Sequence, residues 1–316
     1  MASTAHISSP NEPFPSPDHL DQATTSHRQG AFTVSTRKLP ISKAGPIEHL
    51  EKSLGIPVPE MIFGDNLVAI THEPSAWRIE FNAHDALDLV DKTDKNMLQV
   101  AYARSWSASR EQTSAGIKEV VKPYDWSYTT AYRGTVSPST TPSTTTGTTT
   151  NNDNGNADDG QSSSTTNPTE PSSFSFSTAN APPIPIELLK RRDPILFFDE
   201  VVLYESELDD NGISMYSVKL RVHAARMLLL ARLFMRLDNV LVRVRDTRVY
   251  VDFADEVVIR EYTEREAPFA DAKRALLMTG LRPDDLTVAL RDANQIAELI
   301  PKVHEVREAV CLKAKP

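Results

Sequence analysis

The stretch that decides the fold is residues 193–253, which read DPILFFDEVVLYESELDDNGISMYSVKLRVHAARMLLLARLFMRLDNVLVRVRDTRVYVDF. Residues 195–204 and 218–222 have strand patterns, and the turn-forming residues 207–212 between them predict an antiparallel pair. Residues 222–238 are apolar around about two thirds of a helical circumference, so we interpret them as a helix that is buried against the sheet. These elements suffice to found a hydrophobic core.

Near the end of this stretch, the apolar residues change from even-numbered to odd-numbered positions. Val242 and Val244 are at even positions, whereas Val249 and Val251 are at odd positions. Because alternate residues of a strand point to opposite faces, this change predicts a turn or a bulge at Asp246-Thr247. We therefore expect polar groups to be exposed at a fixed turn.

Upstream of this stretch, the patterns predict short helices and strands. Residues 45–54 are typical of a helix, and Gly55 is a suitable residue to end it. Residues 61–63 and 67–70 are strand-like and are separated by turn-forming residues. A β-hairpin is the simplest interpretation of these two runs.

The next element is a strand that leads directly into a helix. Residues 77–81 alternate between apolar and polar, as expected of a half-buried strand. Asn82 follows as a candidate N-cap, which places Asp85 in the first turn of a short helix. A further alternating strand is predicted at residues 96–104.

The C-terminal part of the chain is predicted to be mainly helical. Residues 257–259 suggest one more strand, and helix patterns follow at 272–279, 293–300 and 302–312. A short helix is also predicted at 186–192. Together these elements indicate an α+β fold in which a central, antiparallel-rich mixed β-sheet is packed with helices in a single domain.

Two segments have compositions that cannot build a core. Residues 1–30 are rich in Ser, Pro, His and Asn, and residues 136–181 consist mostly of Ser, Thr, Pro, Asn, Asp and Gly. Such segments cannot bury enough apolar surface to offset the entropy lost on ordering. We therefore predict a disordered N-terminal tail, a disordered insertion, and one domain that spans the rest of residues 31–312.

Composition excludes several classes of partner. The formal net charge of −9 argues against general binding to nucleic acid or to an anionic membrane, because both require a basic face. Residues 1–20 do not resemble a secretory signal, and the apolar window 227–237 is too short to span a bilayer. The lone Cys311 fits a reducing compartment. We expect a cytoplasmic location, with the nucleus as a second candidate.

The sequence contains no recognisable catalytic or metal-binding motif. The eight histidines are scattered, and one cysteine cannot build a structural zinc site. Phosphate-binding loops and nucleophile elbows are also missing, so we expect no metal and no cofactor. A hydrolase that uses His84 and Asp85 is the enzymatic alternative, but adjacent residues on a helix point about 100° apart and cannot easily cooperate.

Seven segments of the chain form a recognisable set in their order and spacing. They are Phe63-Gly-Asp-Asn66, Ile79-Glu-Phe-Asn-Ala-His-Asp-Ala-Leu87, Val121-Lys-Pro-Tyr-Asp-Trp-Ser-Tyr-Thr-Thr130, Phe197-Phe-Asp-Glu-Val201, Asn211-Gly-Ile-Ser214, Asp246-Thr-Arg-Val-Tyr250 and Arg260-Glu-Tyr-Thr263. Together they resemble the TIP-forty-one/TIPRL family. The similarity covers about residues 31–135 and 184–311, and the long Ser/Thr/Asn insertion and the N-terminal tail depart from it.

This resemblance implies a non-enzymatic regulator of type 2A-like serine/threonine protein phosphatases that acts in TOR signalling. It implies binding to phosphatase catalytic subunits, through a cleft that receives the phosphatase's C-terminal tail. It also implies binding, in some members, to an alpha-four-type regulatory subunit. The alternative is a TOR-pathway scaffold that contacts the phosphatase only through that subunit.

Six residues are candidates for partner binding. A peptide groove needs hydrogen-bond donors, carboxylates that hold these donors in place, and an apolar wall. Asp85, Asp246 and Arg248 lie in matching motifs and could supply the polar groups. Tyr124, Trp126 and Ile184 could supply the apolar surface. Each has a competing interpretation. Asp85 could be a structural cap, the aromatics could simply pack in the core, and Asp246 could pair with Arg248 or cap its own turn.

Overall fold

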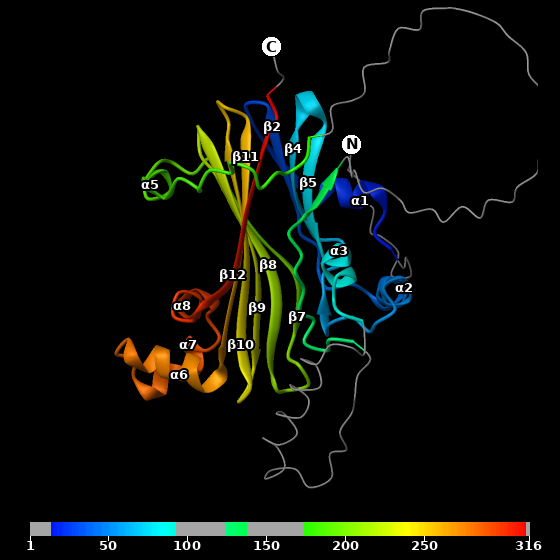
Figure 1. Ribbon diagram of the computed structural model, residues 1–316. Helices are drawn as coiled ribbons and strands as arrows, with labels where there is room; N and C mark the ends of the chain where they lie inside the picture. The colour runs from blue at the N-terminus through cyan, green and yellow to red at the C-terminus, as the bar shows by residue number, and fades with distance from the viewer. Residues whose placement is uncertain (1–13, 93–123, 138–173, 314–316) are drawn as a thin grey trace, which may run out of the picture.

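Two antiparallel β-sheets lie face to face in the computed structural model, which describes residues 14–92, 124–137 and 174–313 (Figure 1). A five-stranded sheet has the order β1-β2-β4-β5-β6, and a seven-stranded sheet has the order β12-β11-β10-β9-β8-β7-β3. The main hydrophobic core lies between them. The α+β class and the antiparallel character predicted from the sequence are confirmed.

The seven-stranded sheet is mostly one meander, because strands β7 to β12 pair in chain order. Its strands are β3 (Met61–Ile62), β7 (Phe197–Ser206), β8 (Gly212–Val222), β9 (Arg226–Leu237), β10 (Leu241–Asp252), β11 (Val257–Pro268) and β12 (Lys302–Cys311). The five-stranded sheet contains β1 (Thr24–Gln29), β2 (Phe32–Arg37), β4 (Leu67–His72), β5 (Trp77–Asn82) and β6 (Thr135–Ser137).

The helices are short. They are α1 (Pro17–Gln22), α2 (Ala44–Leu54), α3 (Ala83–Asp88), α5 (Ile186–Leu189), α6 (Phe269–Met278), α7 (Leu286–Ala289) and α8 (Ala293–Ala297), with 3₁₀ turns at Glu73–Ser75 and Pro283–Asp285. Within the described ranges, no helix is long and apolar enough to cross a membrane. Figure 1 shows α5 and the α6–α8 group over the face of the seven-stranded sheet that is turned away from the five-stranded sheet, which we call its outer face.

Two predicted helices are strands. Residues 222–238 contain the end of β8 and all of β9, and residues 302–312 contain β12. A strand buried on both faces is apolar at nearly every position, so it imitates a buried helix in a periodicity analysis. β9 meets this condition because the inner core covers Leu229, whereas the α6–α8 cluster covers Phe234.

The predicted turn at Asp246-Thr247 is also wrong. β10 pairs without interruption with β9 and with β11 from Leu241 to Asp252. Val249 and Val251 belong to the inner core, whereas Val242 and Val244 pack under α6–α8 on the outer face. The apolar positions change because one core covers the outer face near the start of β10, whereas the other covers its inner face near the end.

Residues 61–70 do not form the predicted hairpin, because β3 pairs with β7 and β4 pairs with β2 and β5. Other local predictions are confirmed. Gly55 ends α2 in the left-handed conformation, with φ of 71°. The Asn82 side chain accepts a hydrogen bond from the Asp85 backbone and caps α3. The strand predicted at residues 96–104 lies outside the described residues.

The boundaries of both segments predicted to be disordered need correction. Residues 14–30 contain α1 and β1, and β1 pairs along its whole length with β2. At the other segment, residues 136–137 belong to β6, and Ser177 forms a two-bond bridge with Ala309 of β12. Phe174 and Phe176 pack against the inner core. The polar composition of these segments did not predict the elements, because their few apolar side chains pack against residues that are distant in the sequence.

Residues 124–134, which we call the seam segment, lie between the two sheets and are hydrogen-bonded to both, because the Tyr132 hydroxyl donates to the carbonyl of Glu80 in β5. The Tyr204 hydroxyl donates to the carbonyl of Tyr128 over 2.9 Å, and the Tyr216 hydroxyl donates to that of Tyr132 over 3.1 Å. Because tyrosines of the seven-stranded sheet hold it, this seam segment is part of the core. Burial raises the pKa of Asp125 in the same segment, although Ser127 donates hydrogen bonds to its carboxylate.

Candidate functional site

The outer face of the seven-stranded sheet is open between two covered ends. At one end, residues 184–196, which include α5 and which we call the strap, cross the sheet; at the other end lies α8 (Figure 1). Two hollows that share Lys219, Leu230 and Asn294 occupy the space between them. We call the combined depression the outer groove. Its floor is formed by side chains of β7 to β10.

The strap is anchored to the outer face at several points. Ile184 is buried against Tyr250 and Ile259. The Arg226 guanidinium donates over 2.6 Å both to the carbonyl of Leu188 and to the carboxylate of Asp193. Ile184 therefore helps to hold the strap, which forms one wall of the groove, against the sheet.

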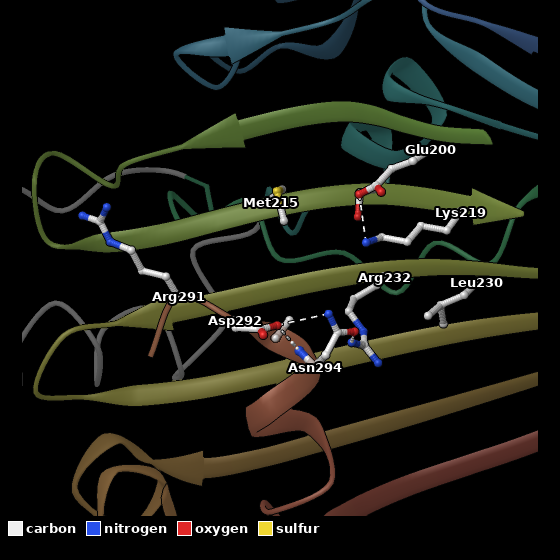
Figure 2. A pocket seen from close by; sticks show the side chains of 10 residues that line it. Glu200, Met215, Lys219, Leu230, Arg232, Arg291, Asp292 and Asn294 are labelled. Atoms are coloured by element: carbon white, nitrogen blue, oxygen red, sulfur yellow. Dashed lines mark hydrogen bonds and ion pairs between the residues drawn. The ribbon is translucent and has the colours of Figure 1, made fainter. Parts of the chain in front are cut away.

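A buried carboxylate organises the centre of the groove. The Asp246 side chain is only 4% exposed, and it accepts two hydrogen bonds from Arg232, at 2.6 Å and 2.7 Å. The third contact of this guanidinium is with Asn294 Oδ1 at 2.8 Å. Figure 2 shows Arg232 and Asn294 facing each other across the gap between the sheet and α8. Burial alone would lower the pKa of Arg232, but the hydrogen bonds and the charge of Asp246 outweigh it and raise the pKa.

Arg248 is held much more loosely than Arg232. Its guanidinium lies 3.6 Å from Asp246, 3.6 Å from Glu261 and 3.9 Å from Glu298, and its side chain is 34% exposed. These distances exceed those of direct hydrogen bonds between charged groups. Arg248 can therefore turn its donors to an incoming acceptor, while Asp246 keeps it in place. The predicted ion pair of Asp246 with Arg248 exists, but Arg232 is the closer partner.

The structure places Asp85 in a different hollow, which shares no lining residue with the outer groove. Arg133, Thr135 and Arg260 line this hollow with it. The Asp85 carboxylate accepts hydrogen bonds from the Thr135 hydroxyl and from Asn82. Burial alone would raise the pKa of Asp85, but these bonds, together with His84, outweigh it and lower the pKa.

His84 and Asp85 are in contact, although adjacent residues of a helix were expected to point apart. The Nδ1 atom of His84 lies 3.2 Å from Oδ1 of Asp85 at the start of α3. In the part of the chain that the structure describes, no group of three His, Cys, Asp or Glu side chains is arranged to hold a metal ion.

The two aromatic candidates lie between the sheets rather than on the outer face. Tyr124 is buried, and its ring centroid is 6.1 Å from that of Tyr128. Trp126 is partly buried and packs against the same core. Of the six candidates, Asp246, Arg248 and Ile184 thus share the outer face, whereas Asp85, Tyr124 and Trp126 do not.

Sequence reasoning missed Arg232 and Asn294 as members of the site. The interpretation of residues 222–238 as a helix gives Arg232 no partner on a neighbouring strand. With the strand pairing known, Arg232 lies directly opposite Asp246. The available signal was a charged residue inside a largely apolar run, because a buried charge needs an oppositely charged partner nearby.

The fold and the groove define a class of protein: a two-sheet α+β protein with an open, charged depression on one face of its larger sheet. Known proteins place the chain more closely. It is 35% identical over 296 residues to the Type 2A phosphatase activator TIP41 of Saccharomyces cerevisiae, covering 88% of this chain and 72% of the relative. It is 36% identical over 293 residues to the TIP41-like protein of Homo sapiens, covering 92% and 90%.

A third relative, the Type 2A phosphatase activator tip41 of Schizosaccharomyces pombe, is 28% identical over 272 residues, which cover 86% of this chain and 92% of the relative. The TIP41-like family matches residues 61–273. The chain belongs to the TIP41-like family, which confirms the resemblance inferred from the sequence motifs. Relatives in two yeasts carry the name of type 2A phosphatase activators.

Proposed function

We propose that the protein is a non-enzymatic regulator that binds the catalytic subunits of type 2A-like serine/threonine phosphatases and modulates their activity in TOR signalling. The names of its relatives support the phosphatase as partner. The observation that carries the proposal is the Arg232–Asp246–Arg248 arrangement in the open groove. We further propose a cytoplasmic location, with the nucleus as a second candidate, which a fluorescent fusion tests.

The groove is suited to an extended segment such as the phosphatase's C-terminal tail. An extended segment presents carbonyl groups along its length and needs donors to satisfy them. Arg248 has donors to offer because its three carboxylate partners lie beyond hydrogen-bond distance. Asp246 acts as a positioning residue, since it is buried and cannot itself touch the tail. The six candidates of the sequence analysis remain predictions for binding.

Reconstitution from purified components tests this proposal. The protein is mixed with a type 2A catalytic subunit alone and, separately, with the alpha-four-type regulatory subunit added. We expect a direct complex with the catalytic subunit alone on size-exclusion chromatography. A complex that forms only when the regulatory subunit is present would favour the scaffold alternative.

Activity must be followed in the same experiment. A substrate assay of the protein alone, with a phosphopeptide and with a simple ester, tests the non-enzymatic part of the proposal. Turnover that is abolished by His84→Ala would contradict it, because His84 and Asp85 are in contact.

A further inference from the structure

The half of the outer groove next to the strap combines apolar and basic side chains. This strap hollow has a volume of about 490 Å³. Among the residues that the structure describes, its lining contains three cationic side chains and no carboxylate: Ile195, Phe198, Lys219, Leu220, Arg221, Leu228, Leu230, Arg248 and Asn294. A surface of this composition favours a ligand that carries negative charge next to apolar groups.

The apolar side of the hollow is unusually exposed. Phe198 is 55% exposed, Ile195 is 50% exposed, and Leu196 beside them is 48% exposed. The strap that carries Ile195 is anchored by the ion pair of Arg226 with Asp193. Adjacent large apolar side chains on an anchored segment mark an interaction surface rather than a frayed loop.

Of the three cationic side chains in the strap hollow, Arg221 is the one whose charge is least neutralised by carboxylates. Lys219 is paired with Glu200 at 2.9 Å, and Arg248 is shared among three carboxylates. Among the described residues, by contrast, none forms an ion pair with Arg221, whose side chain is exposed. The hollow therefore keeps an excess of positive charge at this position.

The sheet register places this charge between two apolar side chains. Arg221 on β8 lies opposite Phe198 on β7 and opposite Leu228 on β9. Neighbouring strands are about 4.8 Å apart, so the three side chains form an apolar, basic, apolar row about 10 Å long. A row of this length matches three or four residues of an extended peptide.

We propose that the strap hollow recognises an acidic residue flanked by apolar residues in the segment that the protein binds, with Arg221 and Phe198 as the residues that determine specificity. The carboxylate of the ligand meets the Arg221 guanidinium, and its apolar neighbours cover Phe198 and Leu228. This inference rests on the proposed function for the identity of the partner, but the chemistry of the ligand follows from the hollow alone.

The first test measures the affinity of the phosphatase catalytic subunit for four variants by biolayer interferometry. We expect Arg221→Glu and Phe198→Ser each to weaken binding about tenfold or more. The matched controls are Arg274→Glu and Met278→Ser, which change exposed residues of α6 outside the groove. Wild-type affinity for both Arg221→Glu and Phe198→Ser would overturn the assignment of the hollow and leave the proposed function standing.

The second test uses the full chain without the phosphatase. The probe is a fluorescent peptide with Phe-Asp-Phe between Gly/Ser ends, and its controls carry Phe-Asn-Phe or Ser-Asp-Ser instead. We expect anisotropy to show binding of the first peptide only, and its loss in Arg221→Glu. Equal binding of the Asp and Asn peptides would overturn the inference. Selective peptide binding without a phosphatase complex would support the hollow and refute the proposed function.

Discussion

Replacing Asp246 by Asn tests the central claim about the outer groove. Both side chains of the Arg232–Asp246 pair are largely buried, at 11% and 4% exposure. The substitution keeps the shape of Asp246 but leaves the Arg232 charge without its closest counter-ion. Removal of one partner of a buried pair costs about 3–5 kcal/mol. Because Asn294 still accepts from Arg232, we expect the low end, about 3 kcal/mol of unfolding free energy.

Urea denaturation followed by circular dichroism measures this loss, which corresponds to a decrease in melting temperature of about 6–12 °C for a domain of this size. A double-mutant cycle with Arg232→Met separates the pair from other effects. The double variant Arg232→Met/Asp246→Asn should be more stable than the sum of the two single changes implies, by about 2 kcal/mol. A cost below about 0.5 kcal/mol for Asp246→Asn would refute the argument that a buried charge pair organises the groove.

Four further predictions follow from the structure. Arg248→Gln should weaken phosphatase binding about tenfold while changing the unfolding free energy by less than about 0.5 kcal/mol, with the exposed Arg274→Gln as the control; wild-type binding would contradict the role of Arg248. The pKa of Asp85 is lowered from 3.8, so its ionised form stabilises the fold above that pH, and the stability advantage of wild type over Asp85→Asn should disappear as pH falls below it in acid titrations monitored by fluorescence. Gly134→Ala should cost about 2–3 kcal/mol in urea denaturation, because φ is +90° and the added Cβ would lie 2.8 Å from Phe81. Deletion of residues 1–30 should lower the melting temperature relative to a truncation that ends before Phe14, since β1 pairs fully with β2; equal melting temperatures would show that β1 contributes nothing.

The sequence predicted elements well where a local signal exists. Asn82 and Gly55 mark helix ends by their own side-chain and backbone chemistry, and both act as predicted. The alternation of apolar and polar residues at 77–81 correctly predicts β5, because only one face of that strand is buried in the core.

The prediction failed where burial on both faces removes the alternation. Residues 222–238 and 302–312 were predicted as helices, yet the pairing of β9 with β10 and of β12 with β11 makes them strands. The same error affected the prediction of the site, because only the pairing of β9 with β10 places Arg232 opposite Asp246. Motif resemblance selected Asp246 and Arg248 as candidates, and the structure places them two residues apart on β10.

The position of the outer groove in the meander has a consequence for dynamics. Most of its floor belongs to the central strands β8 to β10, whose backbone amides should exchange with deuterium only on global unfolding. The strap wall is held by a few side-chain contacts, so its amides should exchange far sooner. A ligand in the groove therefore contacts a floor whose amides are already protected from exchange. It should increase protection mainly in the strap. Slowed exchange confined to residues 184–196 would be the signature of an occupied groove.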